Sequence, residues 1–188
     1  SNGTYEMIIA IEPLNEETFQ KILEYNNSSD LKPYLAITKN RANFLKARVY
    51  DGNIARLKLP TPISFNWIKS TADPSEDFEY PLKGPYFSLR EGNSNISKVA
   101  INFCKKAELL PAALIVPINS KELKELKKSG FIYQEISKNF DTKRSCDNLS
   151  LISSGRVPIP GGLNSKVSVF RDLNSLIEHY AIEIGCLD

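Results

Sequence analysis

Residues 97–118 read Ser-Lys-Val-Ala-Ile-Asn-Phe-Cys-Lys-Lys-Ala-Glu-Leu-Leu-Pro-Ala-Ala-Leu-Ile-Val-Pro-Ile and predict a helix followed directly by a strand. Apolar residues recur at the spacing of one helix face: Ala100, Phe103, Cys104 and Ala107. This spacing predicts a helix over 97–110, which Pro111 ends because proline cannot continue it. The apolar run over 112–118 then predicts a buried strand, and a helix leading into a strand favours an α/β layered fold.

The same alternation of strand and helix continues toward the N-terminus. Residues 5–12 and 34–37 are short apolar runs that predict strands. Asn15 and Thr38 are predicted N-caps of two helices, because each is a short polar residue directly before a helical pattern. Residues 54–59 alternate apolar and basic side chains, which predicts a half-exposed strand.

Two further segments of this first region differ in character. Ser120 begins a helix rich in lysine and glutamate, Gly130 is its predicted C-terminal cap, and 131–136 predicts another strand. Five prolines fall between Pro60 and Pro85, and this density predicts a long surface loop. We expect Phe65 and Trp67 to pack beneath that loop.

The C-terminal part of the chain predicts a separate unit. Residues 141–155 are polar and serine-rich, which predicts a linker. Residues 167–171 and 178–185 alternate like two short strands. The expected architecture is therefore an α/β (α+β) layered domain over 1–140, a linker over 141–155, and over 156–188 a β-ribbon that begins a second domain.

Composition excludes several classes of function. A hydrophobic content of 41% with 24% charged residues is that of a folded globular protein, and no apolar run approaches the ~20 residues of a membrane span. A net charge of +2 lacks the one-sign excess of a nucleic-acid surface. The three cysteines, Cys104, Cys146 and Cys186, are odd in number and dispersed, which favours a reducing compartment. We expect a cytoplasmic protein with neither a nucleic acid nor a membrane as partner.

No residue pattern of the chain indicates a catalytic centre. His179 is the single histidine and lies in a predicted strand, where a sheet residue is the simplest interpretation. Glu178 and Arg171 are predicted to pair across the ribbon as opposite charges on facing strands. Cys104 is predicted to be a small core residue. We therefore predict no catalytic, no cofactor-binding and no metal-ligating residue within the chain.

The ribbon carries a resemblance to a known family. Three segments carry it: Gly155-Arg156-Val157-Pro158, Val167-Ser168-Val169-Phe170-Arg171 and Glu178-His179-Tyr180-Ala181. In this order they resemble the opening of the GTP cyclohydrolase II catalytic domain. The resemblance implies a zinc enzyme of riboflavin biosynthesis that opens the imidazole ring of GTP and releases formate and pyrophosphate. It also implies that the three zinc-binding cysteines lie beyond Asp188, outside this chain.

A second resemblance concerns the first region. Residues 99–115 resemble a helix-to-strand passage of dihydroxybutanone phosphate synthase, and residues 35–42 are similar to a segment of degenerate synthase-like domains. The family's His, Glu and Asp fall on Ile96, Lys98 and Asn102. Because a lysine cannot ligate Mg²⁺ and repels it, the resemblance implies a degenerate, catalytically inactive synthase domain.

Together these resemblances imply the N-terminal portion of a GTP cyclohydrolase II, with GTP as substrate of the whole protein, zinc bound outside this chain, and a homodimer as the expected assembly. Two alternatives remain open from the sequence. The first domain is a non-catalytic dimerisation or scaffold domain, or it is a synthase that works with substituted residues.

Overall fold

The computed structural model describes residues 5–25, 32–81, 83–128, 132–133, 135–136, 149–160, 164–172 and 178–185. The chain divides into two compact units, Ser1–Thr142 and Lys143–Asp188. The first, which we call the α/β unit, contains a four-stranded sheet, and the second contains a separate three-stranded sheet. The predicted α/β class is thus confirmed as a mixed α/β architecture.

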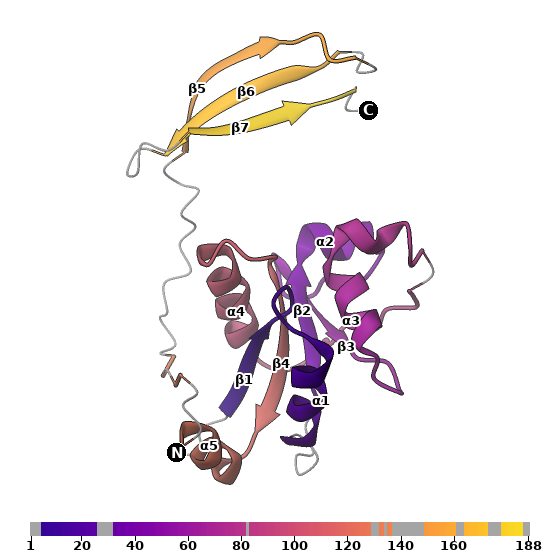
Figure 1. The fold of residues 1–188 in the computed structure, drawn as a ribbon, viewed down its shortest axis with the longest axis vertical. Coiled ribbons are helices and arrows are strands. Elements are labelled where there is room, and N and C mark those ends of the chain that lie inside the picture. Colours follow the sequence, from indigo (N-terminus) through magenta and orange to yellow (C-terminus); the bar gives the residue numbers. More distant parts are fainter. Residues whose placement is uncertain are drawn as a thin grey trace. The chain divides into compact units, whose positions relative to one another are not determined.

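The sheet of the α/β unit has the strand order β1-β4-β2-β3, and all its pairings are antiparallel (Figure 1). Its strands are β1 (Tyr5–Ala10), β2 (Tyr34–Thr38), β3 (Ile54–Lys58) and β4 (Ala112–Ile118). In the register, Leu114 of β4 faces Ile9 of β1 on one side and Leu35 of β2 on the other. All seven residues of β4 are buried, which explains its unbroken apolar run.

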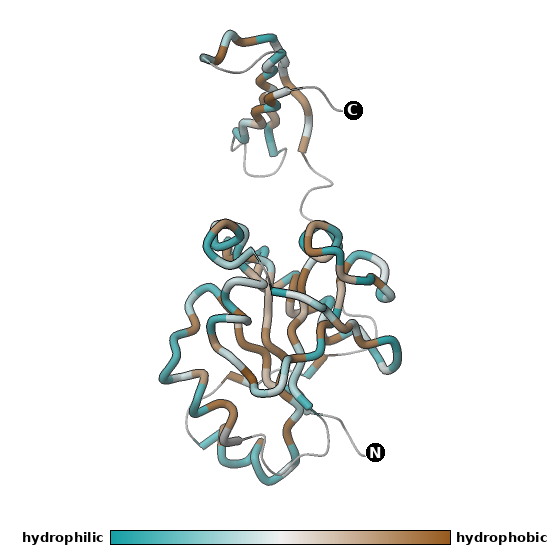
Figure 2. Tube along the Cα trace, turned by 90° about the vertical axis from the view of Figure 1, so that its right-hand side faces the viewer, coloured by the Kyte–Doolittle hydropathy of each residue, from teal (hydrophilic) through white to brown (hydrophobic). Residues whose placement is uncertain are grey.

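Helices cover both faces of this sheet. They are α1 (Glu16–Tyr25), α2 (Lys39–Phe44), α3 (Phe65–Ala72), the 3-10 helix η2 (Pro74–Asp77), α4 (Asn95–Lys106) and α5 (Ser120–Lys128). Phe19 of α1 and Ile68 of α3 share one core with Leu114, whereas Ala100 of α4 packs with Ile115 on the opposite face. The most hydrophobic segments consequently run through the middle of the unit (Figure 2).

Both predicted N-caps are confirmed. The Asn15 side-chain oxygen accepts a hydrogen bond from the Thr18 amide at 2.8 Å, and the Thr38 hydroxyl accepts one from the Arg41 amide at 3.2 Å. Each bond satisfies an amide that the first helical turn leaves without a partner.

The prediction of a surface loop over 60–85 is wrong, because α3 and η2 lie inside it. The Ser64 hydroxyl caps α3 by accepting from the Trp67 amide at 3.3 Å. The prolines do not interrupt this helix, since they fall before it, at the start of η2, or after it. Proline is tolerated at a first helical position, where its missing amide is not needed.

Three other features of the α/β unit differ from the predictions. The strand over 54–59 is not half-exposed: Arg56 is buried and its guanidinium pairs with Asp51 at 2.8 Å, which compensates its charge. Helix α4 ends at Lys106, because Glu108 adopts a left-handed conformation with φ 57° that turns the chain before Pro111. Residues 132–133 and 135–136 form no strand, and Gly130 lies outside the described residues.

The described residues of the second unit form three strands and not the predicted two. They are β5 (Leu149–Arg156), β6 (Lys166–Asp172) and β7 (Glu178–Glu183), in the antiparallel order β5-β6-β7. Strand β5 occupies the second half of the segment that we predicted as a linker. The linker was predicted because the segment is rich in serine. Nearly all residues of β5 are exposed, however, and an exposed strand accepts polar side chains.

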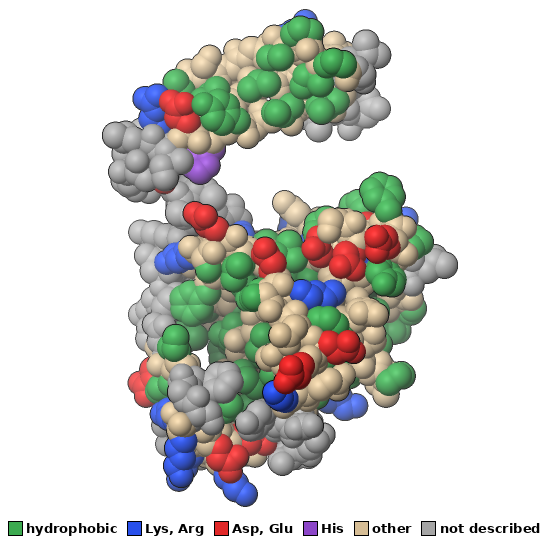
Figure 3. Space-filling model, viewed as in Figure 1, with side chains coloured by type: hydrophobic (Ala, Val, Ile, Leu, Met, Phe, Trp, Pro, Cys, Tyr) green, Lys and Arg blue, Asp and Glu red, His purple; other side chains and the backbone are tan. Residues whose placement is uncertain are grey.

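The three-stranded sheet carries apolar side chains on both faces. Val167, Val169, Tyr180 and Ile182 share one face by register, and Leu149, Leu151, Phe170 and Ala181 share the other. Figure 3 shows hydrophobic side chains gathered on this unit's surface. Among its described residues, only Ser165 and Ser168 are buried. Across the described part of the whole chain, no helix is long and apolar enough to cross a membrane.

Candidate functional site

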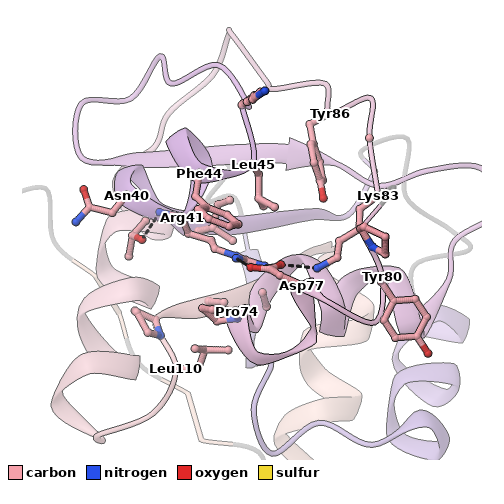
Figure 4. A pocket seen from close by; sticks show the side chains of 18 of the residues that line it. Asn40, Arg41, Phe44, Leu45, Pro74, Asp77, Tyr80, Lys83, Tyr86 and Leu110 are labelled. Carbon is pink, nitrogen blue, oxygen red and sulfur yellow. Dashed lines mark hydrogen bonds and ion pairs between the residues drawn. The ribbon is translucent and has the colours of Figure 1, made fainter. Parts of the chain in front are cut away.

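The candidate site is a cavity of about 1160 Å³ within the α/β unit. Its walls come from α2, from the segment 74–86 that includes η2, and from residues 110–112 at the start of β4 (Figure 4). Segments far apart in sequence therefore meet here, which is typical of a ligand pocket.

Arg41 holds the floor of the cavity together. The cap at Thr38 fixes the start of α2, and Arg41 extends from the first turn of that helix toward the end of α3. Its Nε donates to the Thr71 carbonyl at 2.8 Å, and its Nη2 donates to the Ser70 and Asp73 carbonyls at 3.0 and 3.2 Å. These carbonyls end α3, where a cation also opposes the negative end of the helix dipole.

Asp77 of η2 lies between two cations, Arg41 and Lys83. Arg41 donates to both carboxylate oxygens, at 2.5 Å from Nη1 and 2.7 Å from Nη2. The Lys83 Nζ donates to Asp77 Oδ1 at 2.6 Å and to the Ser70 carbonyl at 2.6 Å. Hydrogen bonds from Arg41, and then from Lys83, lower the pKa of Asp77 to about 2. We call these three residues the ion triad.

Tyr86 borders the cavity above the ion triad, and Figure 4 shows its hydroxyl directed toward Asp77 and Lys83. Burial raises the pKa of Tyr86, and the nearby Thr71 hydroxyl opposes that shift. Even so, neither hydroxyl meets hydrogen-bond geometry with any described residue. Trp67 packs against Tyr86, with ring centroids 5.7 Å apart, and the Trp67 indole donates to the Lys83 carbonyl at 2.9 Å.

Three exposed aromatic side chains complete the cavity wall: Phe44, Phe78 and Tyr80. Phe44 is 67% exposed and lies under the Arg41 guanidinium at 5.5 Å, and Phe78 is 97% exposed. The ion triad is a poor proton-transfer group, because a carboxyl with a pKa of about 2 is a weak base at neutral pH. The arrangement is therefore suited to binding and not to acid–base catalysis.

The positions that the synthase resemblance singled out do not contribute to this cavity. Ile96, Lys98 and Asn102 all lie on α4, which packs on the other face of the sheet. Cys104 of the same helix is buried as predicted, and its thiol donates to the Ala112 carbonyl at 3.7 Å. Burial raises the pKa of Cys104, which makes it a core residue and not a reactive thiolate.

The residues singled out in the ribbon lie in the second unit. Arg171 and Glu178 face each other across β6 and β7 with an ion pair of 2.5 Å, which confirms the predicted pair. His179 is an exposed residue of β7. Phe65 and Trp67 lie on α3 and not under a loop, and Phe65 packs against Phe19 at 5.5 Å.

Within the described part of the chain, no group of three or more His, Cys, Asp or Glu side chains is arranged to hold a metal ion. Cys146 and Cys186 lie outside the described residues.

Sequence reasoning missed most of the cavity. Asp77, Lys83 and Tyr86 lie in the segment that we predicted to be a loop, so nothing marked them as partners of α2. One sequence feature could have drawn attention to Arg41. It lies three residues after the Thr38 cap, in the first turn of a predicted helix, and it belongs to the segment 35–42 that resembled a known pattern.

Comparisons with known proteins give one distant relative. The chain is 21% identical over 189 residues to GTP cyclohydrolase-2 of Azospirillum brasilense, a match that covers 98% of this chain and 48% of that protein. This chain thus spans about half the length of the curated relative it matches. No protein-family model and no solved structure matches it. The chain is therefore a distant homologue of GTP cyclohydrolase II.

Proposed function

We propose that this chain is the N-terminal portion of a GTP cyclohydrolase II of riboflavin biosynthesis. The observation that carries the proposal is the extent of the match: 98% of the chain aligns with the relative, so the relation includes both units and not a single motif. In this proposal the whole protein opens the imidazole ring of GTP and releases formate and pyrophosphate.

The three-stranded sheet begins the cyclohydrolase domain in this proposal. Its exposed apolar side chains on both faces support that role, because a small sheet of this kind needs further layers for stability. The described residues do not fit a zinc site, since no three His, Cys, Asp or Glu side chains among them are arranged around one point. Cys104 is buried in the core. We therefore derive no catalytic step from residues of this chain.

The α/β unit serves in the proposal as a degenerate dihydroxybutanone phosphate synthase domain without catalytic activity. Lys98 supports this role, because its ammonium group takes the place of a magnesium-ligating carboxylate. The cavity supports it in another way: its one carboxylate, Asp77, is already neutralised by two cations and is unavailable to a metal ion.

The test is GTP turnover by the natural protein that contains this chain. With zinc bound, it should release formate from GTP, whereas the 188-residue chain alone should not. Folded, zinc-loaded protein without formate release would contradict the proposal. Turnover of ribulose 5-phosphate with Mg²⁺, measured on the same sample, should be absent; its presence would contradict the inactive synthase role of the α/β unit.

A second candidate function is a non-catalytic scaffold that dimerises the protein. Exposed phenylalanines on the α/β unit favour it, namely Phe44, Phe78 and Phe87, because large exposed aromatic residues are enriched at interfaces. Light scattering on the 188-residue chain should then give the mass of a dimer. A monomer at high concentration would contradict this scaffold function without affecting the cyclohydrolase proposal.

A further inference from the structure

We propose that the cavity between α2 and the segment 74–86 binds a flat aromatic ligand that carries an anionic group. This inference concerns only the α/β unit and does not depend on the cyclohydrolase proposal. Three independent features of the cavity carry it: its aromatic wall, its charge, and a buried hydroxyl without a partner.

The wall of the cavity offers ring surfaces that are otherwise solvated. Phe44 and Phe78 both line it and are 67% and 97% exposed. An aromatic ligand stacks on such exposed rings and removes their apolar surface from water. The volume of about 1160 Å³ is large enough for a drug-sized ligand.

The charge of the cavity favours an anion. Arg41 and Lys83 outnumber the single carboxylate of Asp77, so the ion triad carries a net positive charge. Lys46 also lines the cavity and adds another positive charge. An ammonium group has three protons to donate, and the Lys83 bonds to the Ser70 carbonyl and to Asp77 account for two of them within the described residues. One donor remains for a ligand.

The Tyr86 hydroxyl supplies the third feature. It is buried near the Thr71 hydroxyl, neither of the two meets hydrogen-bond geometry with any described residue, and it is directed toward the ion triad (Figure 4). A buried hydroxyl without a partner is unfavourable, so such groups are rare in folded proteins. A phosphate or sulfonate oxygen near Lys83 accepts a hydrogen bond from this hydroxyl and removes the penalty.

Trp67 provides the measurement, because it is the single tryptophan and its ring lies 5.7 Å from that of Tyr86. We would titrate the 188-residue chain with phenyl phosphate, inorganic phosphate and benzyl alcohol, and follow Trp67 fluorescence. The expected result is saturable binding of phenyl phosphate, with the anion alone (inorganic phosphate) and the neutral aromatic alone (benzyl alcohol) each about tenfold weaker or worse. No saturable change with phenyl phosphate up to its solubility limit would overturn the proposal.

Matched variants assign the binding to the cavity. Phe78→Ala should weaken binding about fivefold, whereas Phe87→Ala, which removes an exposed phenylalanine outside the cavity, should leave it unchanged. Lys46→Met, just after the end of α2, should weaken it similarly, and Lys39→Met, at the first position of α2 and outside the cavity, should not.

Tyr86→Phe removes only the hydroxyl and should weaken phenyl phosphate binding about tenfold. Circular dichroism confirms that each variant is folded. Equal affinity of the wild-type chain, Phe78→Ala and Tyr86→Phe would place the binding elsewhere and overturn the proposal.

Discussion

The α/β unit and the three-stranded sheet use similar apolar residues but bury them very differently. Ile115 in β4 is fully buried, whereas Ile182 in β7 is 60% exposed. In the α/β unit, α1 and α3 cover one face of the sheet and α4 covers the other. No described helix belongs to the second unit.

This difference shows that an alternating apolar pattern fixes a strand but not its burial. Each residue of β6 and β7 has a partner on a neighbouring strand, so the strands themselves are formed. Stability depends further on apolar area removed from water, and a covering layer supplies that.

Replacement of Arg41 by alanine should destabilise the α/β unit most. It leaves Asp77 with one cation and removes the donors of three carbonyls at the end of α3. Loss of one member of a buried ion pair costs about 3–5 kcal/mol. Urea unfolding followed by Trp67 fluorescence measures it, with Arg48→Ala at an exposed position as control. Equal losses in both variants would contradict the role of the ion triad.

A matched pair of isoleucines compares the two units directly. Ile68→Ala removes a fully buried side chain of α3 and should lower the free energy of unfolding by about 2–5 kcal/mol. Ile182→Ala, at an exposed position of β7, should change it by less than about 0.5 kcal/mol. Urea unfolding followed by circular dichroism measures both. A large loss from Ile182→Ala would show that the three-stranded sheet is covered after all.

The α/β unit should lose stability in acid because of Asp77. Its pKa falls from 3.8 to about 2 on folding, so the ionised form stabilises the folded state. That contribution is complete well above pH 3.8 and is lost as the pH falls toward 2. We expect about 1–2 kcal/mol, because the Asp77 side chain in this largely buried pair keeps 16% of its surface exposed and solvent screens part of the interaction.

Unfolding curves at pH 7 and pH 3 measure this contribution of Asp77. Asp77→Asn should remove it and so flatten the pH dependence, whereas Glu79→Gln at an exposed position should not. An unchanged pH dependence in Asp77→Asn would contradict the assignment.

The smallest effect is expected in the three-stranded sheet. The hydrogen bond from Arg171 lowers the pKa of Glu178, but both side chains are exposed and solvent screens the pair. Glu178→Gln should therefore leave thermal unfolding unchanged within error. A clear decrease in the melting temperature would show that this ion pair matters more than those of most protein surfaces.

Local signals predicted much of the fold. Asn15 and Thr38 were identified as N-caps because capping depends on neighbouring residues alone. Strand β4 was predicted with its observed bounds, since an apolar run before a polar turn is a local pattern. The Arg171–Glu178 pair was also predictable, because two strands joined by a short connection bring their residues face to face.

The sequence by itself therefore determined the capped helices, most strands of the α/β unit and the distant resemblance to GTP cyclohydrolase II. Only the tertiary structure decided that Arg56 is buried and that Arg41, Asp77, Lys83 and Tyr86 meet at one cavity. The reason is physical. Burial and charge pairing depend on which segments pack together, and Arg41 and Asp77 are 36 positions apart in the chain. No local pattern encodes such a contact.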